Sequence, residues 1–366
     1  MNGGKTKAKN YFITLPYQVV GEHLVVQATV RGKERNFIFD TGAPTVVQQT
    51  WYSHNDTRKI KIQDANDVSD STGFAIVDSI QVGSVVFENI PAAVLKGDDI
   101  ISKCFKIDGF IGSNLLRNSI VQFDTDRKVI LITDNKDSLK LSKKYATKML
   151  LDNQSSPLIT VKISETETEI ILFDSGSGGF HNQSHLYIKN YKNRQIFSDS
   201  LNGFGSESGG LWGAEKEKKQ QKFKIPSLKI GDTEITNTWT TVTDDWRSRI
   251  GLKLLDYGKV TIDYRHRKFY FEPKSSSQPY QSKNWPIGTT VKDGKLCVGL
   301  VWESYADKVK LGDEITEIDG QISKPINTIC DLILDDPLRN KQSAKLKLKS
   351  ADGTLKTVTI QKSNEQ

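Results

Sequence analysis

The stretch FIFDTGA at residues 37–43 recurs in pattern as ILFDSGS at residues 171–177. In each copy three apolar residues precede an Asp, a hydroxyl residue and a Gly, which predicts that Asp40 and Asp174 each follow a buried strand. A single triplet of this kind is weak evidence, because Asp and Gly are also frequent in ordinary turns. An ordinary turn does not explain why the whole pattern occurs twice.

Two further blocks recur in the same order at a nearly constant offset, so the chain contains two copies of one β-rich unit. Two copies of this length are too few and too long for a solenoid, whose repeats span about 20–50 residues. We therefore expect two lobes around a pseudo-twofold axis, an arrangement that brings Asp40 and Asp174 face to face. The matching blocks are IQVG at 80–83 with LKIG at 228–231, and IGSNLL at 111–116 followed by VQFD at 121–124 with IGLKLL at 250–255 followed by VTID at 260–263.

The rest of the chain indicates a mainly β protein with more than one domain. Its 366 residues exceed what a single hydrophobic core usually organises. Short β-branched runs separated by Gly, Asn and Asp dominate the two copies, and helical pattern is confined to 114–118 and 184–190. The expected parts are a first lobe at 11–147, a second lobe at 148–273, a polar linker at 274–283, and a small α+β domain at 284–362 with a turn at Asp293-Gly294 and a helix at 326–334.

The net charge of +7 raises the question of nucleic-acid binding, but the distribution of charge argues against it. Lysines are mixed with acidic residues along the chain, and even the densest run, EKEKKQQKFK at 215–224, contains two glutamates. This pattern is typical of a solvated charged face. We expect no nucleic-acid partner.

Cysteine usage does not predict a zinc site. Cys104, Cys297 and Cys330 show no C-x-x-C spacing. Cys297 and Cys330 fall in the same expected domain and could pair, although buried free thiols are the commoner outcome.

No apolar run approaches the roughly 20 residues that cross a bilayer, so no membrane span is expected. The first residues, MNGGKTKAKN, lack the apolar core of a signal peptide. Two alternatives follow: a cytoplasmic protein, or an exported or cell-envelope protein whose signal has been removed.

The repeated motifs resemble those of aspartic peptidases of the pepsin and retropepsin type. FDTGA at 39–43 has the retropepsin form, and FDSGS at 173–177 is similar to the second-lobe version of pepsin-like enzymes. The Ile-Gly pairs at 111–112 and 250–251 resemble the apolar-apolar-Gly element that braces the aspartate loop in this family. The resemblance covers about residues 11–273 and implies a duplicated, two-lobed β-barrel fold and an aspartic endopeptidase; with the segment that follows, it extends to bacterial aspartyl proteases that carry a C-terminal PDZ domain.

The chemistry of that family explains the residue types. Two neighbouring carboxyl groups cannot both ionise readily, so Asp40 and Asp174 would share one proton. The ionised carboxylate takes a proton from a water molecule while the protonated one binds the scissile carbonyl. No cofactor and no metal is required, and we assign no catalytic role to the five histidines, which are His23, His54, His181, His185 and His266.

The resemblance also assigns supporting roles around the two aspartates. Thr41 and Ser175 would place hydroxyl groups across the lobe interface, and Gly42 and Gly176 would bring backbone N–H groups to the carboxylates. The second copy departs from the family pattern in two places. Arg249 stands where an apolar residue is expected, and extra glycines follow the motif at 178–179.

A β-hairpin flap closes over peptide in this family, and residues 63–78 are the first-lobe candidate. Within them we single out Gly73 and Phe74, since Phe74 could cover a side-chain pocket; the alternative is an ordinary exposed loop with Phe74 in the core. In the second lobe, the glycine-rich segment 203–213 with Phe204 and Trp212 is interpreted as a flexible loop at the edge of the cleft. No P-loop lysine and serine follow it, so phosphate binding is a weak interpretation.

The C-terminal segment resembles a bacterial PDZ domain, through LGDEI at 311–315 and IDG at 318–320. Its carboxylate-binding loop would lie around Ile287 and Gly288. A PDZ domain adds a peptide C-terminus to its sheet as an extra strand, which would recruit substrate or regulate the protease. The alternative is a degenerate domain that contributes only stability.

Two functions of different class therefore remain: an aspartic peptidase acting on peptide or protein, and a catalytically silent scaffold that holds peptides in the cleft and the PDZ-like domain. A retropepsin-like homodimer is a third arrangement. Because one chain already carries both aspartates, a monomer is expected.

Overall fold

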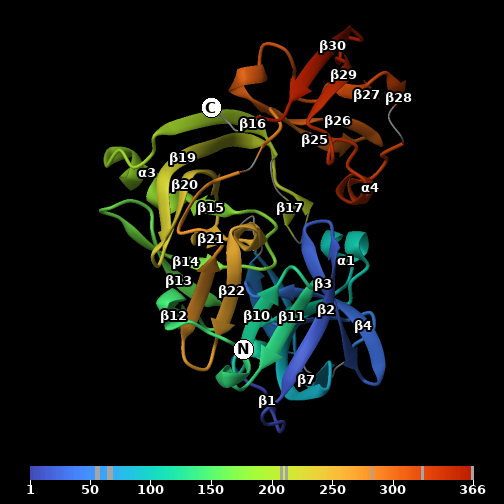
Figure 1. Ribbon diagram of the computed structural model, residues 1–366. Helices are drawn as coiled ribbons and strands as arrows, with labels where there is room; N and C mark the ends of the chain where they lie inside the picture. The colour runs from blue at the N-terminus through green and yellow to red at the C-terminus, as the bar shows by residue number, and fades with distance from the viewer. Residues whose placement is uncertain are drawn as a thin grey trace.

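The computed structural model describes residues 1–53, 58–63, 69–206, 209–210, 213–281, 283–322 and 325–363. The protein is mainly β, as the sequence predicts. Figure 1 shows three parts along the chain, which we call the first repeat (residues 1–145), the second repeat (146–279) and the C-terminal unit (284–363).

The first repeat carries Asp40 at the end of a buried strand. The apolar run before Asp40 lies on β4, whose Phe37 and Phe39 have no exposed surface. Strand β9 runs parallel to β4 and pairs Gly112 with Asp40. The elements of this repeat are β1 (Lys5–Thr6), β2 (Phe12–Val20), β3 (His23–Val30), β4 (Lys33–Asp40), β5 (Val46–Gln48), β6 (Lys59–Gln63), β7 (Ser69–Val82), β8 (Val85–Leu95), α1 (Ile100–Phe105), β9 (Gly109–Gly112), α2 (Ser113–Leu116), β10 (Ile120–Asp124), β11 (Val129–Thr133), η1 (Lys136–Ser138) and η2 (Lys143–Tyr145).

The second repeat builds the same arrangement around Asp174. Phe173 ends β14 without exposed surface and pairs with Ile250 of the parallel strand β21, as Phe39 pairs with Ile111. The elements are β12 (Ala146–Leu151), β13 (Pro157–Lys162), β14 (Thr168–Phe173), β15 (His181–Ser184), α3 (His185–Asn193), β16 (Asp199–Gly205), β17 (Gly209–Gly210), β18 (Gly213–Ala214), β19 (Lys218–Ile230), β20 (Thr233–Thr243), β21 (Arg249–Ile250), η3 (Leu252–Asp256), β22 (Gly258–Asp263), β23 (Lys268–Pro273) and β24 (Ser277–Pro279).

An antiparallel sheet joins the two repeats. Its described strands lie in the order β2, β11, β10, β22, β23 and β12, so its centre is the pairing of β10 with β22. There the amide of Gln122 donates a 2.8 Å hydrogen bond to the hydroxyl of Thr261, its equivalent in the other repeat. A chain of buried aromatic contacts, with ring centroids 5.3–6.0 Å apart, runs through both repeats and joins Phe39, Phe123, Phe173 and Phe269. The strands that end at Asp40 and Asp174 thus rest on one shared core.

The C-terminal unit has a hydrophobic core of its own. Its first hairpin turns at Asp293 and Gly294, both with positive φ, as a two-residue turn between twisted strands requires. Its elements are β25 (Ile287–Lys292), β26 (Lys295–Trp302), η4 (Glu303–Tyr305), β27 (Glu314–Ile318), β28 (Gln321–Ile322), α4 (Ile329–Leu334), β29 (Ser343–Lys349) and β30 (Leu355–Gln361). The core residues include Ile287, Leu296, Val298, Val309, Ile315, Leu332, Leu346, Leu348 and Ile360.

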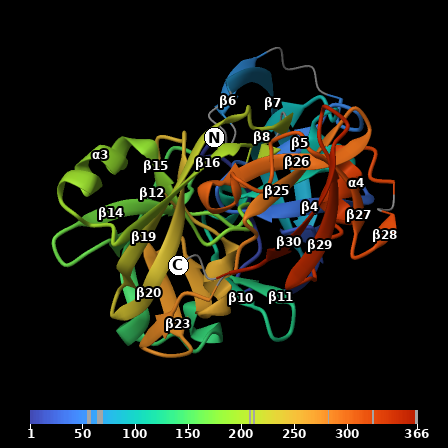
Figure 2. The same ribbon diagram turned by 90° about the horizontal axis from the view of Figure 1, so that it is seen from above.

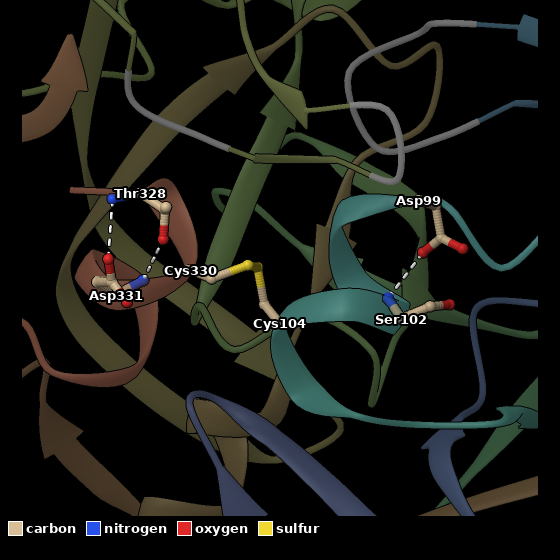
Figure 3. The surroundings of a disulfide bond; sticks show 6 residues. All are labelled: Asp99, Ser102, Cys104, Thr328, Cys330 and Asp331. Atoms are coloured by element: carbon tan, nitrogen blue, oxygen red, sulfur yellow. Dashed lines mark hydrogen bonds between the residues drawn. A yellow bond between two sulfur atoms is a disulfide. The ribbon is translucent and has the colours of Figure 1, made fainter. Parts of the chain in front are cut away.

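The C-terminal unit contacts both repeats, and Figures 1 and 2 show it beside β16 of the second repeat. Strand β16 pairs antiparallel with β26 over Gly203–Gly205 and Leu300–Trp302. On the first repeat, a disulfide links Cys104 of α1 to Cys330 of α4 (Figure 3). A side-chain cap at the N-terminus of each helix, Asp99 on α1 and Thr328 on α4, fixes where the helix begins.

The pairing of Cys297 with Cys330 that the sequence permits is wrong. Cys330 bonds to Cys104, 226 residues away, and Cys297 is the buried free thiol. The error has a physical cause, because sharing a domain does not place two side chains at bonding distance.

Residues 274–281, within the segment expected to be a linker, lie against the second repeat. Strand β24 pairs in parallel with β20, and Tyr280 packs on the rings of Phe180 and Tyr257. The partly buried ring of Tyr280 thus helps to hold this polar segment against the second repeat. Across the described residues, no helix is both long and apolar enough to span a membrane.

Candidate active site

The structure brings the loops of Asp40 and Asp174 against each other. A Cβ atom at Gly42 would lie 2.5 Å from Cγ of Asp174, and one at Gly176 would lie 2.5 Å from Cγ of Asp40. Each carboxyl group thus occupies the space that a side chain on the opposite loop would need. Glycine is required at both positions for this reason, and not for an unusual φ angle.

Four reciprocal hydrogen bonds fix the two loops relative to each other. The Thr41 hydroxyl donates to the carbonyl of Phe173 at 2.9 Å and accepts from the N–H of Ser175 at 2.9 Å. The Ser175 hydroxyl donates to the carbonyl of Phe39 at 2.8 Å and accepts from the N–H of Thr41 at 3.0 Å. Both hydroxyl residues are fully buried. The loops therefore have little freedom to separate.

One oxygen of each carboxylate is held by its own loop. Oδ1 of Asp40 accepts hydrogen bonds from the N–H groups of Gly42 and Ala43, at 2.8 and 3.0 Å. Oδ1 of Asp174 accepts from the N–H of Gly176 at 2.8 Å. These bonds orient the carboxyl groups toward each other without using their second oxygens.

The environment of Asp40 favours its protonated form. Removal from water is the main cause, and the neighbouring carboxyl group of Asp174 adds to it; together they raise the pKa of Asp40 to about 8. The backbone N–H groups of Gly42 and Ala43 act in the opposite direction and lower this pKa. The two carboxyl groups are also hydrogen-bonded to each other. At neutral pH Asp40 therefore keeps its proton.

Arg249, noted in the sequence as a departure, lies beside Asp174. Its Nη1 is 3.5 Å from Oδ2 of Asp174, and its Nη2 pairs with Asp245. The equivalent position in the first repeat is Phe110, which is buried and apolar. The two loops are thus alike in backbone but different in charge.

His23 also lies beside the Asp174 loop, although no motif in the sequence singles it out. It begins β3, and its imidazole hydrogen-bonds the backbone of Gly176 and packs edge-on against Phe105. Burial lowers the pKa of His23 despite the nearby carboxylates, so the ring is neutral at pH 7. Its neighbour Glu22 explains an extra glycine of the second motif, because a Cβ at Gly178 would lie 2.3 Å from Cβ of Glu22.

The Ile-Gly pairs brace the aspartate loops from behind. A Cβ at Gly112 would lie 2.1 Å from the carbonyl carbon of Pro44, and one at Gly251 would lie 2.5 Å from the carbonyl oxygen of Ser177. Ser113 adds a polar contact, since its hydroxyl donates to the carbonyl of Thr41 at 2.7 Å and lies 2.9 Å from the hydroxyl of Tyr264. The backbone of each loop therefore has close support.

The flap candidate is a β-hairpin formed by β6 and β7, with Gly73 paired to Lys59. Phe74 is half-buried below the Arg58 guanidinium, 4.4 Å from its ring centre, and is not one of the buried core residues. Residues 64–68, within the predicted flap, lie outside the described residues. A role of Gly73 and Phe74 in covering substrate stays a prediction.

The glycine-rich segment of the second repeat is not a free loop over its described part. Phe204 lies on β16, which pairs with β26 on one side and β19 on the other. Beside it is a cavity of about 610 Å³ whose lining includes Phe204, Val301, Val309 and Lys310. Trp212 lies outside the described residues.

At the expected carboxylate-binding loop of the C-terminal unit, Ile287 and Gly288 begin β25. The Ile287 side chain is 3% exposed and belongs to the core of the unit. A β-bulge follows Gly288. Peptide contact at these two residues would therefore involve their backbone.

Residues 26–115 match the family model described as aspartyl protease. The match contains the loop of Asp40 and the brace at Gly112, but not the loop of Asp174. No curated protein is significantly similar to the chain. The match supports an aspartic-type protease at the level of the family, with peptide or protein as the class of substrate. Within the described part of the chain, no group of three or more His, Cys, Asp or Glu side chains is placed to hold a metal ion.

Proposed function

We propose that the protein is an aspartic endopeptidase of two pepsin-like lobes, in which Asp40 and Asp174 activate a water molecule. The lobes would span 11–147 and 148–273. The observation that carries the proposal is the reciprocal packing of the two aspartate loops: each carboxyl group lies against the glycine of the other loop, and four hydrogen bonds lock the pair together.

The proposed reaction uses one proton on the pair. The ionised carboxylate takes a proton from water as the water oxygen bonds to the scissile carbonyl carbon, and the protonated carboxyl gives its proton to the carbonyl oxygen. The resulting diol then loses the amine: the first carboxyl protonates the nitrogen, the C–N bond breaks, and a diol hydroxyl returns a proton to the second. The pair ends in its starting state, with one water consumed per bond cut.

We further propose that residues 284–362 form a PDZ-like domain that binds a peptide C-terminus. Strand β25 pairs with β26, and no described strand pairs with its other edge. Helix α4 packs beside β25. An unpaired edge next to a helix is the geometry in which a peptide adds as a strand, and this edge also supports the alternative function, a silent peptide-binding scaffold.

Incubation of the full chain with a mixed peptide library at acidic and neutral pH, followed by mass spectrometry, separates the two functions. We expect cleavage products that are lost in Asp40→Asn and in Asp174→Asn and suppressed by a statine-containing peptide. Because both variants keep the shape of the side chain, their loss of activity would not reflect a lost contact surface. Cleavage that survives either substitution excludes this mechanism, and binding without cleavage in the wild type supports the scaffold.

A further inference from the structure

We propose that Arg249 is a positioning residue that keeps Asp174 ionised, so that Asp40 carries the single proton of the pair. This inference rests on the proposed peptidase function and assigns the two carboxyl groups their separate parts. Asp174 would then accept the proton of the attacking water, and Asp40 would donate to the scissile carbonyl.

The position of Arg249 in the sheet aims its side chain at the Asp174 loop. In β21, Arg249 pairs with Leu172 of β14 on one side and with Asn182 of β15 on the other. Its side chain is only 9% exposed, and that of Asp174 is 10% exposed. A pair of charges held this far from water interacts more strongly than a surface pair.

The guanidinium is itself held in place. Nη2 pairs with Asp245, four residues earlier in the chain, and the side chain of Asp245 accepts a hydrogen bond from the N–H of Arg247 at 3.1 Å. Nη1 is thereby directed toward Oδ2 of Asp174, at 3.5 Å. This oxygen is the one that the loop N–H of Gly176 does not bind.

The other charged and titratable groups facing Asp174 do not replace this cation. Asp40 faces it across the loop interface, and its own charge would repel that of Asp174. His23 approaches from β3 but is neutral at pH 7, and its neighbour Glu22 is an acid. Asp245 is an acid that pairs with the same guanidinium group of Arg249. Among the described residues, Arg249 is thus the cation that pairs with Asp174.

The position equivalent to Arg249 carries no charge in the first repeat. Phe110 occupies the position of Arg249 beside β4 and is 6% exposed. The position that supplies a guanidinium to Asp174 thus supplies an apolar side chain in the first repeat. A carboxylate that is largely removed from water and has no counter-ion is costly, so the proton resides on Asp40.

The test is the pH dependence of kcat/KM, measured for Arg249→Gln and Arg249→Lys with a peptide that the wild type cuts. Loss of the cation makes ionisation of the diprotonated pair harder. We therefore expect the acid limb of the Arg249→Gln profile to move to higher pH by about one unit or more, with the limb restored in part by Arg249→Lys. A purely structural role would lower kcat/KM at every pH and leave the limb in place, which would overturn the proposal.

Asp245→Asn is the matched variant, and it tests the same idea if Arg249→Gln fails to fold. It leaves the guanidinium with Asp174 as its acidic partner, so the acid limb should move to lower pH, opposite to Arg249→Gln. A limb that stays in place or moves upward contradicts the inference. If the wild type cleaves peptide in a manner that depends on Asp40 and Asp174, but the acid limb of the pH profile does not move in either variant, only this inference is refuted. If the wild type does not cleave peptide, the proposed function and the inference are refuted together.

Discussion

Replacing Asp40 with Asn should make the protein more stable at neutral pH while abolishing cleavage. An Asn has the shape of a protonated Asp, and its Oδ1 can still accept from the N–H groups of Gly42 and Ala43. Its amide nitrogen can donate to Asp174, as the shared proton does. The substitution therefore keeps the hydrogen bonds and removes the need to bind a proton.

The size of the effect follows from the pKa of Asp40. An unfolded Asp has a pKa of about 3.9 and loses its proton well below pH 7, whereas the folded group, at about 8, retains it. The folded state thus binds more protons than the unfolded state between about pH 4 and pH 8, so the free energy of unfolding falls as pH rises through this window. At about 1.4 kcal/mol per pH unit, the upper bound at pH 7 is about 4 kcal/mol. Because the proton is shared with Asp174 and Asp40 is partly exposed, we expect about half of this, ~2 kcal/mol.

Urea unfolding of the wild type and Asp40→Asn at several pH values from 4 to 8 measures this directly. The variant should match the wild type near pH 4 and exceed it increasingly toward pH 8. Asp174→Asn is the control: it removes the carboxylate that pairs with Arg249, so its gain in stability should be smaller. The argument fails if the wild type becomes more stable between pH 4 and 8, or if Asp40→Asn is less stable than the wild type at pH 7.

Two other predictions concern the contacts that hold the parts together. Thr41→Val keeps the side-chain shape but leaves the Ser175 N–H and the Phe173 carbonyl unpaired and buried. It should therefore lower the free energy of unfolding by about 2–3 kcal/mol and reduce kcat. A variant with wild-type stability and activity would show that the hydrogen bonds of Thr41 between the two loops are dispensable. The double variant Cys104→Ser, Cys330→Ser should lose about 2–4 kcal/mol, and a reductant should lower the Tm of the wild type but not of this variant; three free thiols in the unreduced wild type would contradict the link.

The sequence predicts most of the framework because the framework is repeated. Short β-branched runs separated by Gly, Asn and Asp predict a mainly β protein, and the duplicated motifs place Asp40 and Asp174 at equivalent strand ends. The turn at Asp293 and Gly294 is predicted by local chemistry, since few residues other than Gly, Asn and Asp tolerate positive φ at both positions. Such signals come either from a few adjacent residues or from a motif that occurs twice, so they can be recognised without the tertiary structure.

Contacts between distant segments left no such signal. The pairing of β16 with β26 uses backbone groups, which every sequence offers, and the Cys104–Cys330 bond joins helices 226 residues apart. His23 reaches the site because a hairpin in the first repeat ends beside Gly176, a placement that no motif around His23 records. A disulfide forms where the surroundings are oxidising, so confirming this bond in the native protein would also favour the exported location over the cytoplasmic one.

The two departures from the repeat pattern carry information that the repeat itself lacks. Perfect twofold symmetry would give Asp40 and Asp174 equal surroundings and leave the proton without a preferred carboxyl group. The structure breaks the symmetry at the departures: Arg249 places a charge on one carboxylate, and Gly178 makes room for Glu22 and the hairpin that carries His23. Both changes act on the second loop, whereas the first keeps an apolar neighbour in Phe110. In a duplicated protein whose two carboxyl groups must act differently, the residues that differ between the repeats are therefore the ones that distinguish the two groups.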